Sequence, residues 1–201
     1  MANLDRPFGL KPVGHLNGSP WNGKTRVYYK AAGLAEAIFI GSLVKSAGSA
    51  DTSGKYPTIQ LAGTAVPRGV VVAFGNTPNI AADVTNLSRL YSPTLTANYV
   101  AVVDDPQVIF ECQEDSSTTF TATAVGLNVS FTTETGNTTT GHSTIELDCS
   151  TENVTSTLVA KILRLVDRVD NALGTYSKWE IMFNAHELCQ GLGMTGTGTP
   201  A

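Results

Sequence analysis

Apolar and polar residues alternate over several short stretches in the second half of the chain. The alternating apolar positions are Val100/Val102, Val108/Phe110/Cys112, Phe120/Ala122/Ala124, Leu127/Val129/Phe131 and Ile145/Leu147/Cys149. Because successive side chains of a β-strand point to opposite faces, each stretch predicts a strand with one apolar face. A polar insertion over Glu134–Ser143 predicts an exposed loop.

The first half of the chain has short β-rich runs with a similar character. They cover Thr25–Lys30, Ala37–Lys45, Thr58–Leu61 and Val66–Phe74. Gly, Pro, Asn and Ser separate these runs, which is typical of sandwiches and barrels. We therefore predict an all-β fold: residues 24–188 form a single β-barrel or a jelly-roll or sandwich-like body.

A hairpin is expected near the end of this body. Thr157–Val166 fits either a short amphipathic helix or a buried strand, and its β-branched residues favour the strand. The turn-forming sequence Asp170–Gly174 follows, and Tyr176–Phe183 then predicts a second strand. Two such runs around one turn predict an antiparallel hairpin.

Residues 1–23 are expected to form an extended N-terminal arm. Pro7, Pro12 and Pro20 disfavour a helix or a central strand there. The segment nevertheless contains several side chains suited to a contact, namely Arg6, Phe8, Leu10, Lys11, Val13, Leu16 and Trp21. This is too much apolar surface for a free linker, so the arm should lie against a neighbouring subunit or against its own chain. Residues 189–201 are Gly-rich and predict a flexible C-terminal tail.

Composition narrows the class of protein. The chain has 201 residues, of which 42% are apolar and 15% charged, so one sizeable core is expected, with additional interface surface. The N-terminus has no apolar signal-peptide region and no stretch is long enough to span a membrane, which favours a cytosol-like compartment and no membrane partner. With no basic cluster, nucleic acid is an improbable partner.

Charge is distributed unevenly along the sequence. Residues 90–160 contain nine carboxylates and no Lys or Arg, whereas the preceding segment is basic. Segments of opposite sign can attract each other within or between subunits, or can simply be solvated faces. The acidic residues proposed for intersubunit contact are Asp104, Asp105, Glu111, Glu114 and Asp115. Asp105-Pro106 also predicts a turn that opens the next strand.

The acidic segment could offer paired carboxylates for glycoside hydrolysis or oxygen ligands for a divalent cation, although a turn explains Asp105-Pro106 more simply. Other catalytic, cofactor and metal sites have no support in the sequence. His15, His142 and His186 are widely separated and have no metal-ligand spacing, and no nucleophile motif accompanies them. Gly191–Gly196 fits G-x-G-x-x-G, but too few residues follow to build a dinucleotide site. We therefore expect no enzyme, no cofactor and no metal. Trp21 and Trp179, with the tyrosines, leave a sugar-binding platform as an alternative to ordinary packing.

Three segments resemble the capsid cement, decoration or head-stabilising proteins of tailed bacteriophages. They are RPFGLKPVGHLNGSPWNGKTRVYY (6–29), YVAVVDDPQVIFECQED (99–115) and LVAKILRLVDRVDNALGTYSKWEIMFNAHEL (158–188). The resemblance implies a structural virion protein that binds the outer capsid surface and bridges neighbouring major capsid protein subunits. It also implies a homotrimer, or a dimer, whose location is the capsid surface and, during assembly, the host cytoplasm.

Other functions remain open at this stage. A tail or baseplate component, a head fibre or a carbohydrate-binding adhesin would also suit a β-rich body with Thr-rich loops. In such a protein, the loop Glu134–Ser143 is the expected place for host binding. A major capsid protein is disfavoured, because its long spine helix has no counterpart in the sequence.

Overall fold

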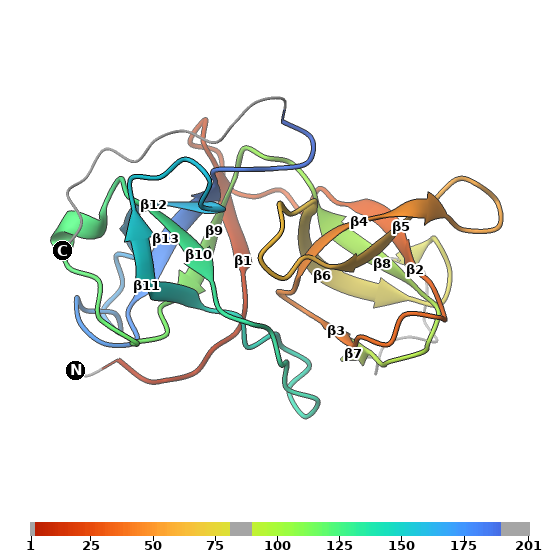
Figure 1. Cartoon of the computed structure of the whole chain (residues 1–201), viewed down its shortest axis with the longest axis horizontal. Helices are drawn as coiled ribbons and strands as arrows, with labels where there is room; N and C mark the ends of the chain where they lie inside the picture. Colours follow the sequence, from red (N-terminus) through yellow and green to blue (C-terminus); the bar gives the residue numbers. More distant parts are fainter. Residues whose placement is uncertain (1–2, 81–89, 190–201) are drawn as a thin grey trace.

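The computed structural model describes residues 3–80 and 90–189 and shows an all-β protein with two sheet units (Figure 1). One unit is a six-stranded sheet with the order β1-β9-β13-β12-β10-β11, and the other is a closed barrel with the order β2-β5-β4-β6-β8. The all-β prediction is confirmed. The body contains the closed barrel and the six-stranded sheet side by side.

The barrel is built from the β-rich runs of the first half of the chain. Its strands are β2 (Arg26–Lys30), β4 (Leu43–Ala50), β5 (Pro57–Leu61), β6 (Gly69–Gly75) and β8 (Asn98–Val103). Their inward side chains form one apolar cluster that includes Tyr28, Val44 and Val100, all buried. A short pair, β3 (Ile38–Phe39) and β7 (Tyr91–Ser92), adds Ile38 to this cluster.

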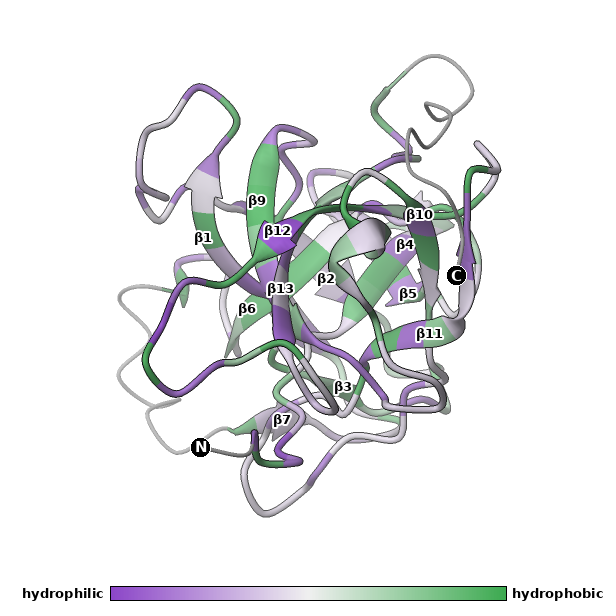
Figure 2. Cartoon of the chain, turned by 90° about the vertical axis from the view of Figure 1, so that its left-hand side faces the viewer, coloured by the Kyte–Doolittle hydropathy of each residue, from purple (hydrophilic) through white to green (hydrophobic). Residues whose placement is uncertain are grey.

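The six-stranded unit uses the alternating stretches of the second half. Its strands are β1 (Lys11–His15), β9 (Val108–Gln113), β10 (Asn128–Phe131), β11 (Leu147–Asn153), β12 (Ala160–Leu165) and β13 (Lys178–Phe183). Strand β9 lies between β1 and β13 and is mostly buried, which agrees with its hydrophobic colour in Figure 2. The predicted hairpin is confirmed, because β12 and β13 pair in antiparallel fashion around the turn.

Both outer strands of this sheet have backbone partners beyond their neighbours in the sheet. On β1, His15 N–H donates to Ser19 O at 2.9 Å and Trp21 N–H donates to Val13 O at 3.3 Å. On β11, Leu147 forms a parallel bridge with Glu114, the residue after β9. That bridge links the outer strand β11 to the end of β9, so this part of the sheet nearly closes on itself.

The two units share one apolar core where they meet. Leu43, Val70 and Val103 of the barrel belong to the same buried cluster as Phe110 and Ile181 of the six-stranded sheet. The N-terminal segment crosses this junction: Leu10 N–H donates to Gly41 O at 3.1 Å and Leu10 is buried. Residues 9–15 therefore pack on their own chain, and β1 occupies an edge of the sheet, as its prolines require.

Two strand predictions need correction. The stretch Phe120/Ala122/Ala124 contains a 3-10 helix, Ala122–Ala124, whose N-terminus is capped by the Thr121 side chain. Thr121 favours this cap because its hydroxyl accepts a hydrogen bond from Thr123 N–H. The run Ala37–Lys45 divides into β3 and β4, because Gly41 adopts a φ of 88° between them.

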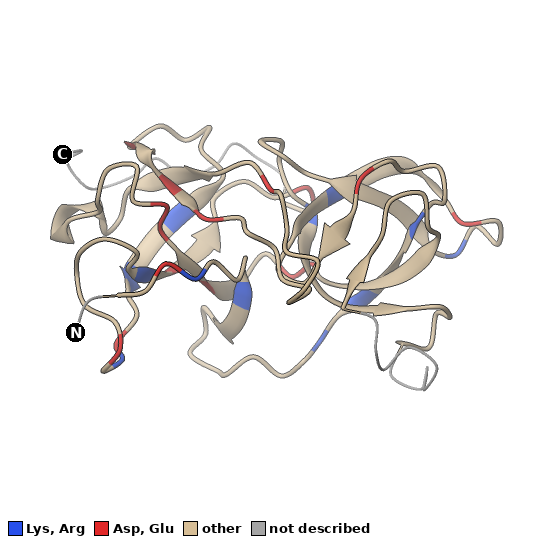
Figure 3. Cartoon of the chain, turned by 90° about the horizontal axis from the view of Figure 1, so that it is seen from below, with Lys and Arg blue, Asp and Glu red and all other residues tan. Residues whose placement is uncertain are grey.

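Within the described ranges, no helix has both the length and the apolar character needed to cross a membrane. The predicted tail, residues 189–201, lies outside the described residues except for Cys189, which is exposed. Charges of both signs occur on both units in Figure 3, so the acidic and basic segments of the sequence do not separate into two halves of the molecule.

Candidate docking groove at the junction

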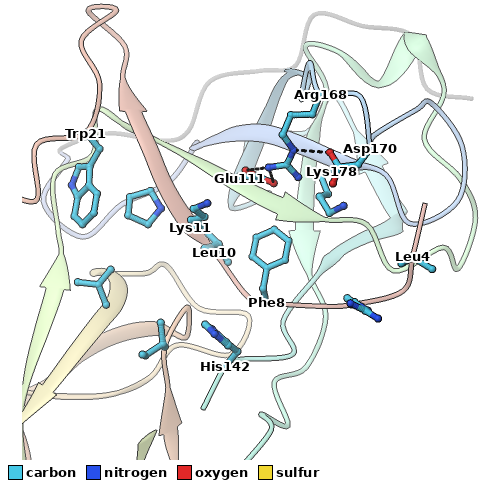
Figure 4. Close-up of a pocket in the computed structure, with 14 residues that line it drawn as sticks. Leu4, Phe8, Leu10, Lys11, Trp21, Glu111, His142, Arg168, Asp170 and Lys178 are labelled. Atoms are coloured by element: carbon cyan, nitrogen blue, oxygen red, sulfur yellow. Dashed lines mark hydrogen bonds and ion pairs between the residues drawn. The ribbon is translucent and has the colours of Figure 1, made fainter. Parts of the chain in front are cut away.

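An open groove of about 810 Å³ lies where the N-terminal segment crosses between the units (Figure 4). We call it the junction groove. Its apolar lining residues are Leu4, Phe8, Leu10, Pro12, Trp21, Ile40 and Val72. Its polar lining residues are Arg6, Lys11, Glu111, His142, Arg168, Asp170 and Lys178. The groove thus combines an apolar wall with four cationic side chains and two carboxylates.

The wall formed by the N-terminal segment is held at both ends. Near the start, the Asn3 side-chain amide donates to Ala172 O at 2.8 Å and to Thr175 O at 2.9 Å, and accepts from Ala172 N–H at 3.0 Å. Further along, Gly9 passes Gly41 so closely that an added Cβ on Gly9 would lie 2.7 Å from Gly41 O. The segment is therefore a fixed part of the groove.

Arg168 pairs with both carboxylates of the groove. Its guanidinium lies 2.8 Å from Glu111 Oε1 and donates to Asp170 Oδ1 at 3.1 Å. By contrast, Arg6, Lys11 and Lys178 form no ion pair within the described parts of the chain. The groove consequently has positive charge in excess, although the whole chain has a net charge of −4.

Trp21 lies at one end of the groove with an unused hydrogen-bond donor. Its Nε1 atom is buried and has no acceptor among the described residues. Trp179 differs, because it is fully buried and its Nε1–H donates to Ser177 Oγ at 2.8 Å. Trp179 therefore cannot form the sugar-binding platform that the sequence left open.

The structure brings most of the predicted arm contacts together. Arg6, Phe8, Leu10, Lys11 and Trp21 all line the junction groove. The other two lie elsewhere: Val13 lines a smaller cavity on the sheet, and Leu16 is 46% exposed beyond the end of β1. The arm is therefore a wall of a groove in this chain.

Three residues of the acidic segment, Asp104, Glu111 and Glu114, are buried. Asp104 accepts from Tyr28 Oη–H at 2.7 Å and pairs with Arg26 at 3.1 Å. Glu111 lines the junction groove and pairs with Arg168, and Glu114 accepts from Phe120 N–H at 3.1 Å. Arg26 and Arg168 are distant in the sequence, and they make the burial of Asp104 and Glu111 possible.

The other two acidic residues have local roles. Asp105 is half-exposed, accepts from Gln107 N–H at 2.9 Å as the predicted turn requires, and lies 3.6 Å from His15 Nδ1. Asp115 accepts from Ser117 N–H and Cys149 N–H, both at 3.1 Å. Only Asp105 retains an exposed carboxylate suited to a neighbouring subunit.

Glu146 lies near the bridge between Glu114 and Leu147, in surroundings that disfavour its charged form. Burial, together with the nearby carboxylates of Asp5, Asp115 and Glu114, raises its pKa from the ordinary 4.5 to about 7. Its Oε1 is buried and has no hydrogen-bond partner among the described residues. The folded chain therefore holds a proton on Glu146 more tightly than the unfolded chain does.

We expect this proton to make stability depend on pH. Because the folded pKa is raised, the stabilising contribution is complete below pH 4.5 and is lost as the pH rises through about 7. Thermal unfolding should show that Tm falls between pH 5 and pH 8, that Glu146→Gln flattens this slope, and that Asp5→Asn flattens it less. An unchanged slope in Glu146→Gln would contradict the assignment.

No group of three or more His, Cys, Asp or Glu residues in the described ranges is arranged to hold a metal ion. Cys112 and Cys149 are buried, and burial raises the pKa of both thiols, which disfavours the reactive thiolate.

The loop Glu134–Ser143 is exposed over most of its length, but its two end residues are not. Glu134 turns inward, where Ser42 Oγ–H donates to its carboxylate, and burial raises its pKa. Ile40 N–H donates to Gly141 O at 2.9 Å, and this places His142 in the junction groove. The tip remains available for the host contact that the sequence suggested.

Several groove residues were missed by the sequence analysis. Arg168, Asp170 and Lys178 flank the turn of the β12–β13 hairpin, where polar residues ordinarily indicate no more than solvent exposure. The only sequence feature that could have indicated a site there was the Arg168-x-Asp170 spacing beside a strand. Ile40, Val72 and His142 had no signal, because their position depends on how the two units pack.

No protein-family model, no curated protein and no solved structure matches this chain.

Proposed function

We propose that the protein is a structural virion protein that binds the outer surface of a phage capsid and bridges neighbouring major capsid protein subunits. One observation carries this proposal: the three segments that resemble capsid cement proteins meet in space. They supply β1, β9, β13 and β12, which are consecutive strands of the sheet. They also supply every lining residue of the junction groove except Leu4, Ile40, Val72 and His142.

The groove has the character of a protein-binding surface. Its lining combines aromatic and aliphatic side chains with charged groups, a mixture that is found at protein interfaces. Bridging a capsid would repeat this contact at every copy, so a modest affinity at each site would still hold the assembly together. The location would be the capsid surface, and the host cytoplasm during assembly.

The test uses point variants, because deletion of residues 2–22 would remove β1 and the buried Leu10. We expect Lys11→Glu to weaken binding to capsids that lack the protein by about tenfold or more, since it reverses a charge in the groove. Co-sedimentation with such capsids measures the binding. The matched control is Lys55→Glu, which alters an exposed lysine in the distant β4–β5 loop.

Equal binding by both variants and the unaltered protein would contradict a role for the groove. Absence of any capsid binding, combined with binding to tails or baseplates, would contradict the capsid proposal itself. A homotrimer is the assembly we propose, with a dimer as the alternative. Light scattering on the 21.1 kDa chain, alone and after release from capsids, distinguishes the two.

A further inference from the structure

The junction groove has an electrostatic requirement that its own chain does not meet. Four cationic side chains line it against two carboxylates, Glu111 and Asp170, and Arg168 pairs with both. Lys178 also acts electrostatically on Asp170, whereas Arg6 and Lys11 form no ion pair with any described residue. An occupant that suits the groove would therefore supply negative charge together with apolar surface.

The positions of these groups favour an elongated occupant. In Figure 4, Trp21 and Leu4 lie at opposite ends of the groove, with Lys11, Phe8 and Lys178 between them. The cations come from separate elements: Arg6 and Lys11 from the N-terminal segment, and Arg168 and Lys178 from the β12–β13 hairpin. An occupant that contacts both Trp21 and Leu4 therefore has to extend along the groove past Lys11 and Phe8.

We propose that the junction groove binds an extended segment of a partner protein in which acidic and apolar side chains alternate. This inference rests on the proposed capsid contact and specifies its chemistry. In an extended peptide, alternate side chains point to opposite sides. One set would therefore contact Phe8, Pro12 and Val72, while the other would face the cations of the groove.

The probe is a short peptide of alternating Glu and Leu, blocked at both ends. The chain has only two tryptophans, so an amide NMR spectrum contains two indole N–H signals. We expect the peptide to shift the Trp21 signal and to leave that of the buried Trp179 in place. The Trp179 signal thus serves as an internal control for an intact fold.

Three comparisons test the chemistry of the occupant. A Lys-Leu peptide should not bind, and a Glu-Ser peptide should bind at least about tenfold more weakly, because it lacks the apolar side chains. Lys11→Glu should weaken binding of the Glu-Leu peptide by about tenfold, whereas Lys55→Glu should not change it. Equal binding of the Lys-Leu and Glu-Leu peptides would overturn the proposal.

A medium-chain fatty acid tests the other kind of acidic apolar ligand. If it shifts the Trp21 signal at lower concentration than the peptide, the groove is a site for small amphiphiles and the proposal is wrong. A failure of the peptide proposal is distinguishable from a failure of the capsid proposal. Peptide binding without capsid binding would contradict only the capsid proposal. Capsid binding that requires Lys11, with no peptide binding, would contradict only the inference made here.

Discussion

Alanine at position 41 is expected to lower the free energy of unfolding by about 2 to 5 kcal/mol, as backbone strain and overpacking together imply. Gly41 has a φ of 88°, which alanine rarely adopts. In addition, the new Cβ would lie 2.7 Å from Phe8 O and 3.0 Å from Gly9 Cα. The N-terminal segment would have to move away from the barrel.

A matched glycine separates the two causes. Gly48 has a φ of 80°, and a Cβ added there would meet nothing within 4 Å. Gly48→Ala should therefore cost only about 1 to 2 kcal/mol for its left-handed backbone. Urea unfolding of the two variants measures the difference. Equal losses of stability in Gly41→Ala and Gly48→Ala would show that the close approach of Gly41 to Phe8 and Gly9 adds nothing to the cost.

The close approach of these two chain segments can also be disturbed by a substitution at Gly9. Gly9 has a φ of 72°, and its added Cβ would lie 2.7 Å from Gly41 O and from Ser143 Cβ. Because both substitutions displace the same contact, the double variant should lose less stability than the sum of the single losses. This non-additivity would identify the crossing as one structural unit.

Arg168→Ala is the second substitution with a large expected effect, a loss of about 2 to 4 kcal/mol from breaking a largely buried ion pair. The side chain of Glu111 is only 6% exposed and would lose its cation. Chemical denaturation measures the loss. Adding Glu111→Gln to Arg168→Ala should restore part of it, because no uncompensated carboxylate would remain buried.

Arg164 on the same hairpin is the control. It forms a two-pronged pair with Glu180, with hydrogen bonds of 2.7 and 2.8 Å, but its own side chain is 68% exposed. An exposed pair of this kind contributes less than about 1 kcal/mol. If Arg164→Ala proved as damaging as Arg168→Ala, burial of Glu111 would not be the cause of the larger loss.

Much of the strand content could be predicted because one-sided burial leaves a two-residue period in the sequence. The β12–β13 hairpin had both the period and a turn, and it was found with nearly its observed bounds. The alternation at Phe120/Ala122/Ala124 has the same period but forms a 3-10 helix, because Thr121 caps it. Periodicity alone does not distinguish these outcomes over so few residues.

The candidate site was only partly predictable. Apolar and cationic residues among prolines indicated that the N-terminal segment lies against a surface, but not that the surface belongs to its own chain. The burial of Asp104 and Glu111 could not be predicted, because a carboxylate is buried only when a partner is present, and Arg26 and Arg168 are far away in the sequence. Such pairings appear only when the strand order is known.

The backbone partners at the two outer strands of the six-stranded sheet bear on solubility. Exposed strand edges recruit strands from other molecules and lead to aggregation. Here Ser19 and Trp21 occupy hydrogen-bonding groups of β1, and Asp115 N–H donates to Leu147 O at the start of β11. A strand from another molecule would have to displace these partners before it could pair with β1 or with the start of β11.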